Sequence, residues 1–106
     1  MIAGTKKQKR GAIKLPKLVR EEIHGVMIEY YPIGKYVVIQ PGGQGGLPTI
    51  KNTRITAGVL VGWVEKGYPP EEVARDYRIA PEAVEEAVEL AKIYDCDRRY
   101  TENVTH

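Results

Sequence analysis

The sequence has few of the residues that build catalytic and metal centres. Its 106 residues include one cysteine, Cys96, and two histidines, His24 and His106. One cysteine excludes an internal disulfide, and the spacing of these three residues is not that of a zinc site. Phenylalanine is absent, and the aromatic residues are Trp63 and seven tyrosines. We therefore expect no enzyme, no metal, no cofactor, and a reducing, cytoplasmic location.

Long apolar segments are also missing. No run of 18 apolar residues occurs, so no transmembrane helix is predicted. The basic run from Lys6 to Arg10 is not followed by an apolar segment, which argues against a secretory signal. We expect no association with a membrane.

Charge is distributed unevenly along the chain, although the net charge is only +2. Residues 1–20 carry seven basic side chains and no acidic one, whereas residues 56–106 carry six basic and eleven acidic ones. A basic arm of this kind can bind phosphates, or it can be a solvated tail. The candidate nucleic-acid-binding residues are Lys6, Lys7, Lys9, Arg10, Lys14, Lys17 and Arg20.

We divide the chain into a basic arm (1–20), a β-hairpin with a glycine-rich connector (21–47) and a three-helix domain (48–106). Residues 26–31 and 35–39 are rich in β-branched and aromatic residues, and the intervening Pro32-Ile33-Gly34 predicts a turn. The glycine-rich connector lacks the Lys-Ser/Thr pair of a phosphate-binding loop.

Three helices are predicted from capping residues and apolar spacing. Thr56 has the chemistry of a helix cap, and Gly67 that of a helix end. Pro70 and Pro81 suit the first turns of the next two helices. Trp63 is expected to be buried against Tyr77, Val84 and Val88. The expected fold is mainly α: a three-helix, homeodomain-like helix-turn-helix domain preceded by a small β-hairpin.

Four glutamates follow one face of the expected third helix, at Glu82, Glu85, Glu86 and Glu89. A solvated face is the expected interpretation, and a hard-cation site is the alternative. Acidic side chains repel phosphate, so this face is unsuited to reading DNA as a third helix does.

Residues 46–55, GLPTIKNTRI, resemble the "G-x-P-x-I-x-G-T-R-I" opening of domain-of-unknown-function family 433. The resemblance continues through residues 59–63, 67–77 and 81–87. Asn52 replaces a glycine that is usual in the family, and Arg78 replaces a frequent proline. The resemblance implies a homeodomain-like fold and a VapB-type antitoxin, with a PIN-like ribonuclease toxin as partner.

Such nucleases gather acidic residues around a metal, so an inhibitor is expected to present a cation to them. The candidate partner-binding residues are Arg54, Arg98 and Arg99. A structural ion pair from Arg54 to Asp76, or to a helix C-terminus, is the alternative for Arg54, and plain solvation is the alternative for the other two.

The expected function is that of a prokaryotic type II antitoxin that inhibits its nuclease and also has a basic arm able to bind DNA. Two alternatives remain open: a DNA-binding transcriptional regulator without a toxin, and a protein-interaction module on a helix-turn-helix scaffold. The sequence leaves the oligomeric state open, including a homo-oligomer.

Overall fold

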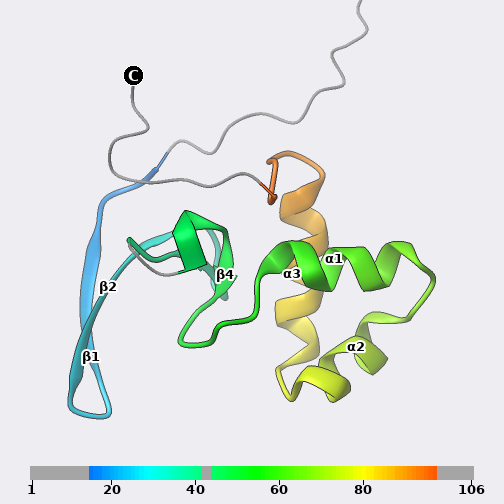
Figure 1. Cartoon of the computed structure of the whole chain (residues 1–106), viewed down its shortest axis with the longest axis horizontal. Coiled ribbons are helices and arrows are strands. Elements are labelled where there is room, and N and C mark those ends of the chain that lie inside the picture. The colour runs from blue at the N-terminus through cyan, green and yellow to red at the C-terminus, as the bar shows by residue number, and fades with distance from the viewer. Residues whose placement is uncertain (1–14, 42–43, 98–106) are drawn as a thin grey trace, which may run out of the picture.

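The computed structural model describes residues 15–41 and 44–97. A four-stranded antiparallel sheet comes first, in the order β1 (Val19–Ile23), β2 (Val26–Pro32), β3 (Val37–Ile39) and β4 (Thr49–Ile50). A short 3-10 helix, η2 (Gln44–Gly46), precedes β4. Three helices follow: α1 (Ala57–Glu65), α2 (Pro70–Tyr77) and α3 (Pro81–Ala91). Figure 1 shows the sheet and the helices side by side.

The fold is therefore mixed α/β, and the expected mainly α fold was wrong. The predicted hairpin is present, because β2 pairs with β3 and Tyr31 lies opposite Ile39. However, β1 and β4 extend it on both sides into a sheet. β1 begins at Val19, within the segment expected to be a basic arm.

A tight turn at His24 and Gly25 explains the additional strand β1. Both residues have positive φ, 52° and 81°, and Ile23 lies opposite Val26 across a two-residue loop. Positive φ at both central positions is the requirement of a type I′ turn, the turn that best matches the twist of paired strands. The β1–β2 hairpin that results extends away from the helices (Figure 1).

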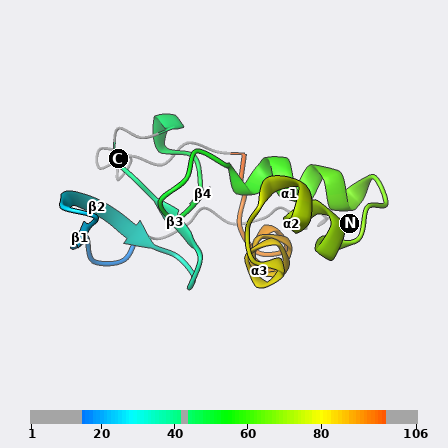
Figure 2. The same cartoon turned by 90° about the horizontal axis from the view of Figure 1, so that it is seen from below.

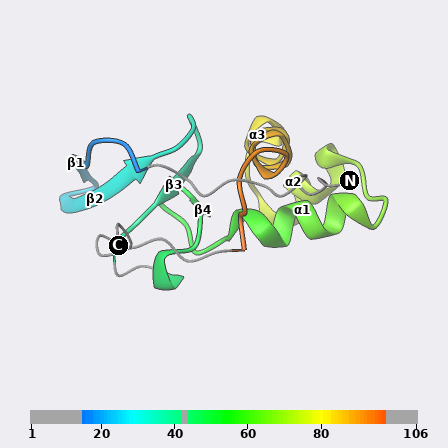
Figure 3. The same cartoon turned by 90° about the horizontal axis from the view of Figure 1, so that it is seen from above.

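The core lies where the sheet meets the helices. All three residues of β3 are buried, and Val37 packs into the apolar cluster formed by the helices. Ile39 packs instead with Leu15, Tyr31 and Tyr94. Figures 2 and 3 show β3 and β4 between the β1–β2 hairpin and the helices. The buried strand β3 is thus the central connection between the two parts of the molecule.

All three helices begin where the sequence predicts, and α1 ends just before Gly67. Thr56 occupies the cap position of α1, although its side chain makes no capping hydrogen bond. Pro70 and Pro81 are the first residues of α2 and α3. Small buried alanines on α3, including Ala83 and Ala87, allow α1 and α2 to pack closely on it. None of the helices in the described ranges is long and apolar enough to cross a bilayer.

Glu86 of α3 binds the loop that leads into β3. Its carboxylate accepts hydrogen bonds from the backbone N–H groups of Lys35 (3.0 Å), Tyr36 (2.9 Å) and Val37 (3.0 Å). Hydrogen bonds to an ionised acceptor are stronger than neutral ones. Glu86 therefore ties the sheet to α3, and the expectation that all four glutamates form a solvated face was wrong at this position.

A second polar contact joins the two edge strands across the sheet. Lys51 directly follows β4, and its Nζ lies 2.9 Å from Oε1 of Glu21 on β1 and 4.9 Å from the ring centroid of Tyr30. The Tyr30 hydroxyl donates to Glu21. That hydrogen bond, followed by the contact with Lys51, lowers the pKa of Glu21, and the contact with Glu21 raises the pKa of Lys51.

Candidate binding site between α1 and α2

The reversal of the chain after α1 builds one side of a pocket. Gly67 has a φ of 108°, which favours glycine, and it turns the chain back toward α1. The backbone N–H of Tyr68 then donates to the carbonyl of Trp63 at 3.3 Å. The two rings meet edge to face, with centroids 5.3 Å apart and planes at 82°. Trp63 and Tyr68 thus form two perpendicular aromatic walls.

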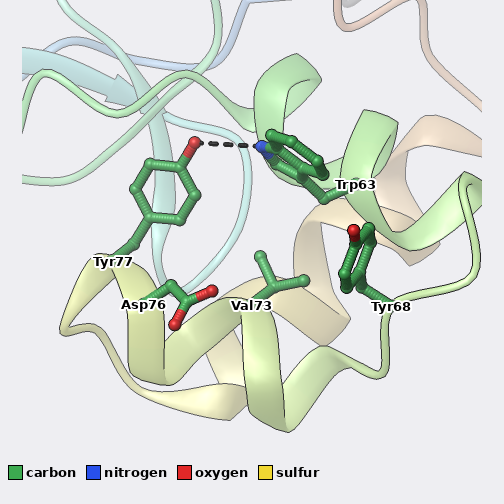
Figure 4. Close-up of a pocket in the computed structure, with 5 residues that line it drawn as sticks. All are labelled: Trp63, Tyr68, Val73, Asp76 and Tyr77. Atoms are coloured by element: carbon green, nitrogen blue, oxygen red, sulfur yellow. Dashed lines mark hydrogen bonds between the residues drawn. The ribbon is translucent and has the colours of Figure 1, made fainter.

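Helix α2 supplies the other side. Val73, Asp76 and Tyr77 are spaced at i, i+3 and i+4, so they lie on one face of the helix. The Tyr77 hydroxyl accepts a hydrogen bond of 3.1 Å from the indole Nε1 of Trp63. Figure 4 shows Trp63 facing these three α2 side chains, with Tyr68 at one end of the pocket.

The five side chains enclose a volume of about 320 Å³ that is open to solvent. Val73 is buried, whereas Trp63 is 39% exposed and Tyr68 is 44% exposed. The expectation that Trp63 would be buried was therefore wrong, although its predicted contact with Tyr77 is present. The indole lines a surface pocket because Leu60 and Val61, earlier in α1, fill the core instead.

The electrostatics of the pocket favour a cation. Asp76 is exposed, and within the described part of the chain it forms neither an ion pair nor a hydrogen bond. Lys66 Nζ lies 5.0 Å from the centroid of the Trp63 ring, although Lys66 does not line the pocket. Residues 56–97 contain ten acidic and four basic side chains, so their net charge is −6.

Most of the basic residues expected to bind nucleic acid lie outside the described residues. These are Lys6, Lys7, Lys9, Arg10 and Lys14. Lys17 is exposed. Arg20 is on β1, where its Nε lies 2.7 Å from the Glu29 carboxylate on β2. Part of the expected basic surface therefore belongs to the sheet.

Two of the three candidate partner-binding residues, Arg98 and Arg99, also lie outside the described ranges. Arg54 is exposed and has no ion-pair partner among residues 15–41 and 44–97, so the alternative ion pair with Asp76 is absent. Arg54 lies outside the pocket.

Sequence reasoning missed the pocket, although one signal was present. Trp63 is spaced at i+3 from Leu60 and precedes Val64, and this helical spacing of apolar residues favours a position in the core. The signal is the set of polar and amphipathic side chains near Trp63 in the helical region. Asp76 and Tyr77 come one turn after Val73, and Tyr68 follows Gly67. Tyrosine and tryptophan combine an apolar ring with a polar group and suit surfaces that bind ligands.

The described residues contain no cluster of three histidine, cysteine, aspartate or glutamate side chains placed to hold a metal ion. Glu82, Glu85 and Glu89 are exposed on α3, while Glu86 turns toward the sheet. Cys96 is buried. The pocket between α1 and α2 is therefore the principal candidate site in these residues.

A family model described as "Protein of unknown function (DUF433)" matches residues 37–91, slightly more than half of the chain. The chain belongs to this family. The matched region runs from β3 to the end of α3 and contains every residue of the pocket. β1 and β2 lie outside the part that defines the DUF433 family. Comparisons with curated proteins and with solved structures gave no match.

Proposed function

We propose that this DUF433 protein is a non-enzymatic binding module that serves as the antitoxin of a prokaryotic type II toxin–antitoxin pair in the cytoplasm. The observation that carries the binding role is the open aromatic pocket of Trp63, Tyr68 and Tyr77. Tryptophan and tyrosine are enriched at protein interfaces and among the residues that dominate binding energy. Two such rings are more than one third exposed here.

The antitoxin role is supported by the family resemblance, which implies a PIN-like ribonuclease as the partner. An inhibitor of such an acidic active site can present arginine, which pairs with a carboxylate in a bidentate geometry. Arg54 is exposed and forms no ion pair with the residues in the described ranges, so binding of a toxin carboxylate would break no ion pair with those residues. Arg98 and Arg99 are the other candidate cations.

A DNA-binding regulator without a toxin is the alternative function. Charge argues against DNA recognition by α3, because Glu82, Glu85 and Glu89 are exposed on it. The net charge of −6 in residues 56–97 adds to the repulsion of phosphate. Any DNA binding is therefore assigned to the basic residues that precede β1, from Lys6 to Lys17.

The test is inhibition of the nuclease encoded by the adjacent reading frame. That protein is purified with and without this chain, and its ribonuclease activity is measured on a fluorescent RNA. We expect a stable complex in gel filtration and loss of ribonuclease activity when the two proteins are equimolar. An active nuclease that neither binds this chain nor loses activity in its presence contradicts the antitoxin role.

Two variants then locate the inhibitory cation: Arg54→Ala and the double variant Arg98→Ala/Arg99→Ala. Circular dichroism first establishes that each variant is folded. Weaker inhibition by one variant identifies the arginine that enters the active site. Full inhibition by both variants shows that these arginines do not inhibit the nuclease, and the pocket then becomes the candidate inhibitory surface.

A further inference from the structure

We infer that the pocket between α1 and α2 binds the guanidinium group of an arginine side chain on a partner protein. This inference rests on the proposed binding role, but it does not depend on the partner being a nuclease. It assigns a ligand chemistry to Trp63, Tyr68, Asp76 and Tyr77.

The aromatic walls attract cations. The face of an aromatic ring carries partial negative charge, and tryptophan gives the strongest cation–π interaction. Lys66 Nζ lies 5.0 Å from the Trp63 centroid, but Lys66 does not line the pocket, so this contact is separate from the space that a ligand would enter. The perpendicular Trp63 and Tyr68 rings present a face and an edge to the same space. A planar cation can stack on one of these rings while its edge remains free.

The carboxylate of Asp76 provides the counter-charge for that edge. Figure 4 shows it beside Tyr77 and Val73, in the group of side chains that faces Trp63. It has no ion-pair or hydrogen-bond partner within the described part of the chain. A guanidinium group is planar, stacks on aromatic rings and presents parallel N–H donors that match a carboxylate. Arginine satisfies both the ring and the acid, whereas an ammonium group cannot stack.

The size of the pocket fits a single side chain. Ligand pockets for small molecules and cofactors span about 300–1,000 Å³, and this pocket, at about 320 Å³, is at the lower end. The buried Val73 side chain adds an apolar surface against which the methylene groups of an arginine can pack. The pocket also opens to solvent, so a side chain on the surface of a partner can enter it.

A nucleobase is the competing ligand, because bases also stack on aromatic side chains. A nucleotide brings phosphates with it, and the pocket lies in a helical region with a net charge of −6. The same charge attracts a basic partner from a distance. The observations therefore favour a cationic protein side chain over a nucleic acid.

Trp63 is the only tryptophan of the chain, so its intrinsic fluorescence reports directly on the pocket. The full-length protein is titrated with a short glycine-serine peptide that contains one arginine. A matched peptide with citrulline, the uncharged isostere of arginine, is the control, and guanosine monophosphate is the nucleotide probe. We expect a saturable change with the arginine peptide and binding about tenfold weaker with citrulline.

Asp76→Asn is the decisive variant, because it removes the charge and keeps the size of the side chain and the fluorescent reporter. We expect it to weaken binding of the arginine peptide about tenfold. Glu71→Gln is the matched control, since Glu71 is an exposed acid on the same helix outside the pocket, and its affinity should equal that of the parent. Matching near-ultraviolet circular dichroism establishes that the fold is unchanged.

Three results overturn the inference: equal affinity for arginine and citrulline, equal affinity of the Asp76→Asn and Glu71→Gln variants, or tighter binding of the nucleotide than of the arginine peptide. If the peptide does not bind while the protein still inhibits the nuclease, the pocket chemistry is wrong and the proposed function stands. If the peptide binds and no nuclease is inhibited, the pocket chemistry stands and the proposed antitoxin function is wrong.

Discussion

Gly34 and Glu86 lie so close together that a single methyl group on residue 34 would collide with the Glu86 carboxylate. Gly34 has no positive φ, so the constraint is steric and not conformational. The absence of a side chain at residue 34 lets the carboxylate reach three consecutive backbone N–H groups at the start of β3. This contact holds α3, and with it the helices of the candidate site, against the sheet.

We predict that Glu86→Gln lowers the free energy of unfolding by about 2 kcal/mol, since it replaces a charged acceptor of several N–H groups with a neutral amide. Glu89→Gln is the control, because Glu89 is exposed and its ion pair with Lys92 is exposed too; its effect should stay below about 0.5 kcal/mol. Urea unfolding followed by circular dichroism measures both. Equal effects in the two variants would show that the hydrogen bonds to β3 contribute little.

Gly34→Ala should destabilise the protein by about 1–3 kcal/mol, because the new methyl group displaces the carboxylate or the loop. In a Glu86→Ala background the same substitution should cost much less, since nothing then occupies that space. A double-mutant cycle by urea unfolding measures this coupling. Additive effects of the two substitutions would contradict the steric explanation.

Two large side chains of α1 should differ in their contribution to stability. Leu60 is fully buried, so Leu60→Ala should cost about 2–5 kcal/mol through lost burial and a cavity. Trp63 is 39% exposed and lines the open pocket, so Trp63→Ala should cost about 1–2 kcal/mol. Thermal unfolding of both variants tests the order. A larger loss for Trp63→Ala would indicate that the indole is a core residue.

The contact between Glu21 and Lys51 makes a defined contribution to the dependence of stability on pH. The lowered pKa of Glu21 means that its contribution is present above its ordinary value of 4.5 and is lost as the pH falls through the lower, folded value. The raised pKa of Lys51 gives a contribution that is present below 10.5 and is lost as the pH rises through the higher, folded value.

Because the Tyr30 hydroxyl is the first cause of the lowered Glu21 pKa, Tyr30→Phe should move that pKa upward toward 4.5. A titration of the Glu21 carboxyl by NMR measures the change. The stability difference between parent and variant should shrink below pH 4.5, where both lose the charge. An unchanged Glu21 pKa in Tyr30→Phe would show that the hydroxyl is not the cause.

The sequence is a good guide to the helices and a poor one to the sheet. Helix bounds follow from local chemistry, such as proline in a first turn and Gly67 after the last one, and these predictions were confirmed. β1 was missed because three of its five residues are charged. Val19, Glu21 and Ile23 are half-buried while Arg20 and Glu22 are exposed, but the charge of Glu21 conceals this alternation in the sequence. β4 has only two residues and depends on pairing with β3, which no local pattern reveals.

The candidate site shows the same limit. Helical spacing correctly placed Trp63 near Tyr77, but it does not show which side of an apolar stripe faces the core. That choice depends on how α2 packs on α1 after the turn at Gly67. The contact between Glu86 and the β3 loop was equally inaccessible, because it joins residues about fifty positions apart.

The basic side chains before β1 are the candidates for contact with DNA. A deletion that tests the arm should remove residues 1–14 and not 1–20, because Leu15 packs against Ile39 and β1 begins at Val19. The shorter deletion removes Lys6, Lys7, Lys9, Arg10 and Lys14 and leaves the sheet complete.

Binding of the full chain to a mixed-sequence DNA duplex should be weakly specific and should fall steeply with salt. Each phosphate contact contributes about −0.9 to the slope of log K against log salt concentration, so five contacts give a slope of about −4.5. The deletion should nearly abolish binding, whereas Lys92→Gln, which removes a cation directly after α3, should leave the affinity and the slope unchanged. Fluorescence anisotropy over a series of salt concentrations measures both quantities. If the deletion variant binds with the affinity and slope of the full chain, the arm does not bind DNA, and an arm that acts only as a solvated tail becomes the correct description.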